Sequence, residues 1–200
     1  MKPRALLLVL ALTAGLPWPA AAAGEDPDWP CIQRLVPEIA PGMIWAGPPV
    51  DSVDAGTEDA KLRKLAGELA ARRVPLEQAE QLVADFAAGL DPEEKNEKLT
   101  LLFARALEII NRDRSSIIGG IKRYTRNQKK LAAKIADTNA ELRRLPKDDV
   151  AGRDALKQQR DWDIRIYDDR RKSLAYLCEQ PVLLEQRAFA LARAIASHLE

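Results

Sequence analysis

The feature that most constrains this chain is a pair of long helical patterns separated by one short turn. The first pattern starts at Asp91, and nothing obliges it to end before Pro146. Asp91 fits an N-cap and Pro92 suits the first helical position, while Glu93 and Glu94 complement the positive end of the helix dipole. A continuous helix of this length would span about 80 Å at 1.5 Å per residue. The sequence therefore predicts a rod.

The second long pattern runs from about Arg153 to His198, after a proline- and glycine-containing turn at residues 146–152. Two long helices joined by so short a turn must lie antiparallel. Pro181 lies inside the second helix and should kink it, at a cost of about 3 kcal/mol unless tertiary contacts support it. The apolar positions of this helix are Leu156, Trp162, Ile166, Leu174, Leu177, Leu184, Ala188, Leu191 and Ile195.

The apolar seam of the first long helix advances in alternating steps of three and four residues, the period of a coiled coil. An extra step of four between Tyr124 and Gln128 is a stutter, which should locally unwind the supercoil. Few apolar residues lie off the seam, so we expect residues 121–177 to project as a two-helix antiparallel coiled-coil hairpin. The seam comprises Phe103, Ala106, Ile110, Asp113, Ile117, Gly120, Tyr124, Gln128, Leu131, Ile135, Thr138, Leu142 and Leu145.

Two shorter amphipathic patterns precede the rod, over residues 58–73 and 75–88. Pro75 is expected as the first residue of the second short helix, and Gly89 as its stop. The predicted fold is all-α, with the short helices packed on the base of the hairpin to make one helical domain over residues 58–200.

The start of the chain has the order of a secretory signal peptide: two basic residues, an apolar run at residues 5–16, then alanines. The apolar run is too short to span a bilayer, which takes about 20 residues. An uncleaved anchor is disfavoured because Pro17 and Pro19 interrupt any helix there. We expect residues 1–23 to be removed after Ala23, and the mature chain to contain no transmembrane segment.

Two cysteines in an exported chain are expected to pair. A bond between Cys31 and Cys178 would remove on the order of 4–5 kcal/mol of loop entropy from the unfolded chain. A redox pair or a metal site is the alternative, but the chain has no C-x-x-C motif and its one histidine, His198, stands alone.

Residues 24–57 are rich in proline and glycine and show no helical or strand period. Their tryptophans and aliphatic residues are too apolar for a solvated tail, so we expect an extended arm on the helical body. Counting outward from the turn places Cys178 opposite two adjacent glycines, which either open a hollow for the arm or are a tolerated flexible spot. The candidate docking residues are Trp29, Trp45, Gly119, Gly120 and Pro181.

Charge is balanced over the chain, with 31 basic and 30 acidic residues, which together with export disfavours nucleic acid as a partner. Locally, residues 112–144 carry ten basic and three acidic side chains. This basic face could contact an anionic envelope component, or be neutralised across the hairpin by the acids of residues 148–169. The candidate contacts are Arg123, Arg126, Lys129 and Lys130.

No constellation of catalytic residues is recognisable, and we expect no cofactor, no metal site and no enzymatic activity. Ser115 and Ser116 have neither a nearby base nor a strained elbow. Four aspartates of the last helix are interleaved with arginines and a lysine, which indicates ion pairs on a solvated face. They are Asp161, Asp163, Asp168 and Asp169.

Three segments resemble a group of exported helical proteins of unknown function from Gram-negative bacteria: DWPCIQR at 28–34, IWAGP at 44–48 and CEQPVLLEQR at 178–187. The resemblance implies a periplasmic location and no catalytic residues.

Our leading hypothesis is a non-catalytic periplasmic interaction or scaffold protein that docks another periplasmic or envelope protein through its hairpin, since a long two-helix arm offers much surface. The alternatives are a binder of an anionic envelope component and, third, a thiol redox factor.

Overall fold

The computed structural model describes residues 26–53 and 60–200, so the predicted signal peptide lies outside the described residues. The predicted all-α class is confirmed: the described part of the chain contains helices and no strand. The α-helices are α1 (Ala60–Ala70), α2 (Leu76–Ala88), α3 (Pro92–Arg144) and α4 (Val150–Ala196), and the arm contains the short 3-10 helices η1 (Pro41–Met43) and η2 (Val50–Ser52).

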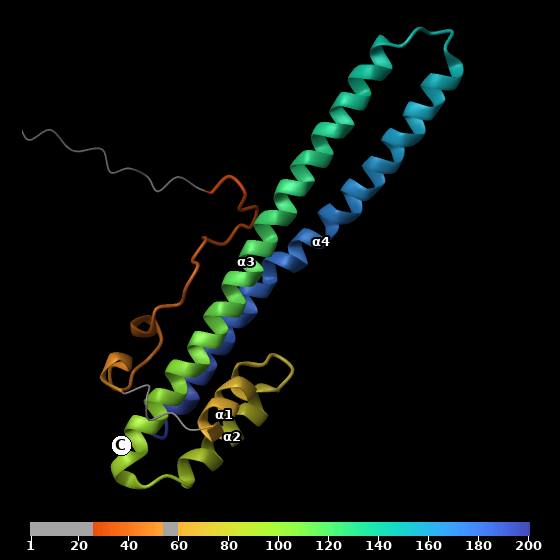
Figure 1. Cartoon of the computed structure of the whole chain (residues 1–200). Coiled ribbons are helices and arrows are strands. Elements are labelled where there is room, and N and C mark those ends of the chain that lie inside the picture. Colours follow the sequence, from red (N-terminus) through yellow and green to blue (C-terminus); the bar gives the residue numbers. More distant parts are fainter. Residues whose placement is uncertain (1–25, 54–59) are drawn as a thin grey trace, which may run out of the picture.

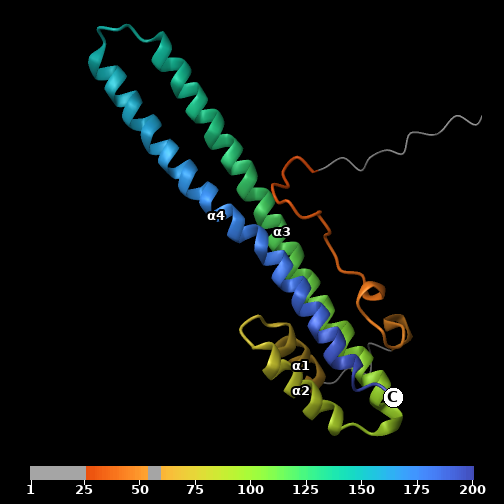
Figure 2. The same cartoon turned by 180° about the vertical axis from the view of Figure 1, so that it is seen from behind.

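Helices α3 and α4 lie side by side and antiparallel in both views, and they form the long hairpin (Figures 1 and 2). Helix α3 alone has 53 residues. Helix α4 begins at Val150, three residues earlier than predicted, because the Asp149 carboxylate accepts a hydrogen bond of 3.0 Å from the Gly152 amide and caps the helix. Asp91 precedes α3 as predicted, although its side chain makes no capping hydrogen bond.

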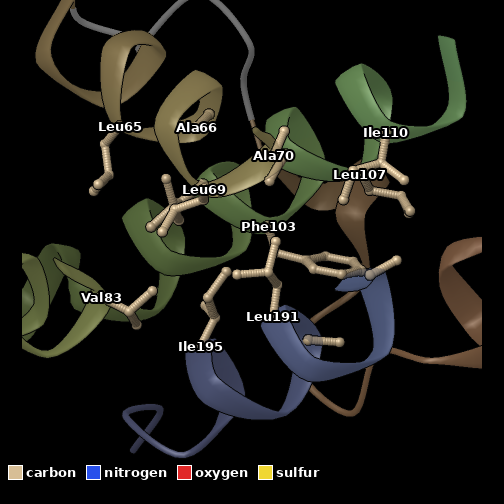
Figure 3. Packing of buried hydrophobic residues seen from close by; sticks show 14 of the residues in the cluster. Leu65, Ala66, Leu69, Ala70, Val83, Phe103, Leu107, Ile110, Leu191 and Ile195 are labelled. Atoms are coloured by element: carbon tan, nitrogen blue, oxygen red, sulfur yellow. The ribbon is translucent and has the colours of Figure 1, made fainter. Parts of the chain in front are cut away.

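The apolar core lies at the base of the hairpin, where α1 and α2 pack against α3 and α4 (Figure 3). Phe103 and Leu191 face one another across α3 and α4, and Leu69 and Val83 contribute from the short helices. Each of these side chains is almost fully buried, which stabilises the fold by about 1.5–3 kcal/mol per residue. The base therefore carries most of the apolar burial.

A buried arginine of α4 sets where α1 ends. Arg187 donates from Nε to the Leu69 carbonyl at 2.6 Å and from Nη1 to the Val74 carbonyl at 2.8 Å. The first contact satisfies a carbonyl that the end of α1 leaves without a partner, and the second fixes the turn before α2. Helix α1 stops at Ala70, earlier than predicted. Pro75 has an extended ψ of 150° and is the N-cap of α2, not its first helical residue.

The buried face of α3 differs from the predicted seam by one residue over part of its length. Arg114, Ile118 and Ile121 are buried, whereas Asp113 is exposed and Ile117 is only half-buried. The buried positions advance by two successive steps of four after Ile110, so the stutter comes earlier than predicted. Arg114 is buried at this position with its Nη2 3.5 Å from the Glu185 carboxylate, which supplies the opposite charge.

The seam of α4 also differs from the prediction at one aromatic residue. Trp162 is 59% exposed, and the neighbouring Asp163 is 4% exposed in its place. Asp163 is satisfied there by Lys134 at 2.9 Å and by Gln159 at 3.0 Å. Burying an aspartate costs little free energy when its carboxylate is paired. Trp162 stays exposed because no further helix among the described residues packs on this part of the hairpin to cover its indole.

Pro181 lies inside a continuous α4 and is buried, with side-chain hydrogen bonds around it. The Gln180 amide donates to the Tyr176 carbonyl at 3.2 Å, and Gln33 of the arm donates to the Cys178 carbonyl. These contacts bond the two carbonyls that neighbour that of Leu177, the residue four before Pro181 whose carbonyl loses its helical donor to the proline.

Replacing Arg187 with alanine is expected to lower the free energy of unfolding by about 2–4 kcal/mol, because two carbonyls would lose a charged donor and a cavity would open. Chemical denaturation followed by circular dichroism measures the loss. The matched control is Arg171→Ala on the same helix, a side chain that is 69% exposed. Equal stability of the two variants would contradict the role assigned to Arg187.

Candidate interaction surfaces

A disulfide joins the arm to the hairpin. Cys31 and Cys178 are bonded, with their Cα atoms 5.6 Å apart and a sequence separation of 147. Next to the bond, Trp29 donates from Nε1 to the Gln33 carbonyl at 2.8 Å, and the Gln33 amide donates to the Cys178 carbonyl. The segment around Cys31 is thus a compact turn fixed to α4 between the base and the tip of the hairpin.

The two adjacent glycines of α3 do not receive the arm. A Cβ added at Gly119 would come within 4 Å only of the Arg123 guanidinium, at 3.4 Å, and one at Gly120 only of the same group, at 3.9 Å. The hollow predicted there is therefore filled by α3's own arginine, three and four residues further along. Residues at that spacing are neighbours on a helix surface, and the missing side chains let Arg123 lie flat.

The part of the arm around residues 39–47 docks instead on the base of the hairpin, where α1 and α2 pack. The indole of Trp45 stacks on Phe103, with ring centroids 4.2 Å apart and an interplanar angle of 6°. A Cβ at Gly47 would approach the Trp45 ring to 2.4 Å, so this position requires glycine. Nearby, the backbone of Ile39 makes a pair of hydrogen bonds with the Asn111 side chain, at 2.9 and 3.1 Å. Sequence reasoning missed Asn111, whose low helix propensity in mid-helix was the available signal.

The part of the arm that precedes Cys31 lies on the basic face of α3. Asp26 pairs with Lys122 at 2.8 Å, and Asp28 pairs with both Arg126 and Lys129 at 3.0 Å. Hydrogen bonds from these basic side chains hold the pKa of both aspartates below the ordinary value, with Lys122 the largest cause at Asp26 and Lys129 at Asp28. Two of the four predicted anionic-partner contacts, Arg126 and Lys129, therefore already face carboxylates of the same chain.

The hairpin above the disulfide is held by polar contacts between α3 and α4. The Tyr124 hydroxyl donates to the Arg170 carbonyl at 2.8 Å, and the Gln128 amide donates to the Tyr167 carbonyl at 3.1 Å. Lys134 and Asp163 form the ion pair described above. Such directional contacts fix the register of the two helices, although they add little apolar burial.

The outer surface of α4 carries exposed apolar side chains at heptad spacing. Trp162 is 59%, Tyr176 67% and Leu183 39% exposed. Residues seven and fourteen apart lie near one line along a helix, so these three form a ridge, which we call the α4 ridge. Two exposed aromatic residues that share one helix face, with Asp169 between them, make this face a candidate contact surface.

The remaining candidates show no arrangement for catalysis. Ser115 donates to the Pro37 carbonyl at 3.5 Å, and Ser116 is exposed. Among the described residues, no group of three or more histidine, cysteine, aspartate or glutamate side chains could hold a metal ion. Three of the four aspartates singled out in α4 pair with a neighbouring basic residue as predicted: Asp161 with Arg160, Asp168 with Arg171 and Asp169 with Lys172. The fourth, Asp163, is buried and pairs with Lys134 of α3 instead, so it does not lie on a solvated face.

Removing the disulfide by Cys31→Ser and Cys178→Ser is expected to lower the free energy of unfolding by about 5 kcal/mol, the loop entropy returned to the unfolded chain. Chemical denaturation under non-reducing conditions measures it. A loss below about 1 kcal/mol would contradict this expectation, because the non-covalent contacts of the arm would then hold it on the hairpin without the disulfide.

The arm contacts of Asp26 and Asp28 are expected to depend on pH. Because folding lowers both pKa values below the ordinary value of 3.8, the contribution of these contacts to stability is fully present above pH 3.8 and is lost as the pH falls through the folded pKa. Asp26→Asn with Asp28→Asn should raise amide hydrogen exchange in residues 26–30 at neutral pH. Glu38→Gln, at an exposed site on the same arm, is the control, and unchanged exchange in the double variant would contradict the assignment.

Among the residues that the structure describes, no helix is both long and apolar enough to cross a membrane. No known family model matches the chain, and neither a curated protein nor a solved structure does so.

Proposed function

We propose that this chain is a non-catalytic interaction protein of the bacterial periplasm that docks a partner protein through its hairpin. The signal-like start and the resemblance to exported helical proteins support the location. The disulfide is consistent with it, since such bonds persist in oxidising compartments.

The observation that carries the proposal is the α4 ridge. Exposed tryptophan and tyrosine residues are enriched among the side chains that dominate binding energy at protein interfaces. Their heptad spacing matches the period with which a further helix packs against a coiled coil. The partner element that fits is an amphipathic helix laid along α4, with its apolar face over Trp162 and Tyr176.

The surroundings of the ridge suit docking. Asp169 lies between Trp162 and Tyr176 on the ridge line, and the exposed Arg165 and Lys172 flank it. A partner helix with complementary charges beside its apolar stripe would be oriented by them. The polar contacts with α3 and the anchored base hold α4 in place before the partner arrives, which reduces the entropy lost on binding.

Trp162→Ala with Tyr176→Ala is expected to reduce partner capture at least tenfold, because two exposed aromatic anchors are removed while the fold is left intact. The measurement is photo-crosslinking in intact cells from a reactive residue at position 169, with the attached protein identified by mass spectrometry. Met43→Ala, which removes a 67% exposed apolar side chain from the arm, is the control. Undiminished capture by the double variant would reject the ridge as the docking surface.

Binding of an anionic envelope component through the basic face of α3 has weaker support, because Asp28 already engages Arg126 and Lys129. Arg123 and Lys130 are the two predicted contacts that pair with no carboxylate among the described residues.

A further inference from the structure

A hollow of about 310 Å³ lies at the tip of the hairpin, between the end of α3 and the start of α4. Its lining contains no carboxylate. The lining residues are Asn139, Leu142, Leu145 and five basic residues, Arg143, Lys147, Arg153, Lys157 and Arg160. We propose that this hollow, the tip pocket, binds a phosphate group, carried either by a lipid headgroup or by a small soluble phosphate.

Donors remain free in the pocket after the internal contacts are made. Arg153 uses Nη1 for the Leu142 and Leu145 carbonyls at 2.9 and 3.3 Å, which fixes its guanidinium at the pocket wall. Arg160 uses Nε and Nη2 for the neighbouring Asp161. A guanidinium carries five N–H donors, so both arginines keep donors for a ligand. Planar guanidinium groups suit the paired oxygens of a phosphate.

The positive charge exceeds what the hairpin itself needs. Lys157 pairs with Asp154 and Arg160 with Asp161, and both aspartates lie outside the lining. The carboxyl end of α3 adds the equivalent of about half a negative charge. The amino end of α4 offsets this with about half a positive charge. Three of the five basic side chains of the lining, Arg143, Lys147 and Arg153, form no ion pair with a described residue, and a phosphate monoester supplies about −1.5 to −2. Residues 139–161 as a whole have six basic and five acidic side chains, so the positive excess is confined to the lining.

The tip pocket also differs in charge from the larger hollow of the molecule. The hollow of about 570 Å³ between the arm and α3 has charges of both signs, with Glu38 and Glu108 near Arg112. At the tip, the first residue of α4, Val150, is 64% exposed. An apolar side chain next to a cluster of basic residues is a combination that favours contact with anionic headgroups.

The test uses the mature protein with two probes. Pyrophosphate is titrated while backbone amide resonances are followed by NMR, and sedimentation is measured with vesicles of phosphatidylglycerol and of phosphatidylcholine. We expect shifts confined to residues 139–160, or co-sedimentation with phosphatidylglycerol alone. A response to pyrophosphate identifies a soluble phosphate as sufficient, and a response to vesicles alone identifies a headgroup.

Substitutions in the lining test whether the tip pocket is the site that binds these probes. Arg143→Gln, Lys147→Gln and Lys157→Gln together should weaken binding at least tenfold and spare the capping contacts of Arg153. The matched control removes the same charge from the shaft of α4, by Arg165→Gln, Arg171→Gln and Lys172→Gln. Equal weakening by the control, or no response to either probe, would overturn the proposal.

Discussion

The bond between Cys31 and Cys178 is the constraint on which the rest of the arrangement depends. A two-helix rod can bury apolar side chains only along one seam, so its outer half gains little from the hydrophobic effect. The disulfide brings a second layer, the arm, to the middle of that rod. Below it, Trp45 continues the apolar core onto the arm, and above it polar contacts between α3 and α4 accompany a narrow apolar seam that includes Ile121 and Leu142.

The arm also changes the electrostatics of α3. Asp26 and Asp28 pair with three basic side chains of the stretch that the sequence marks as strongly basic, at distances of 2.8–3.0 Å. These pairs are partly exposed, so each is weak alone and screened by salt. They act together with the covalent bond three residues further along, which keeps the carboxylates at a high local concentration.

The sequence predicts the long helices well because their ends carry local signals, Asp91 and Pro92 at one end and the turn at 146–152 at the other. It predicts the seam less well, because periodicity alone cannot show that Arg114 is paired with Glu185 or that Asp163 is paired with Lys134. The partners of those side chains come from the other helix, and such partners override local preference. The arm shows no helical or strand periodicity, so the sequence alone does not indicate which of its residues contact the helices. Those contacts are seen only in the folded structure.

The same geometry divides the surface of the hairpin along its length. Several basic side chains in the middle of α3 already form ion pairs with Asp26 and Asp28 of the arm. An anion could bind them only by breaking these ion pairs. At the tip no carboxylate lines the pocket, and its basic groups gather around an open space. The outer face of α4 offers aromatic surface instead. The two sites that we propose, one for an anionic and one for an apolar ligand, thus lie at different places on the hairpin, and the arm covers part of the basic surface of α3.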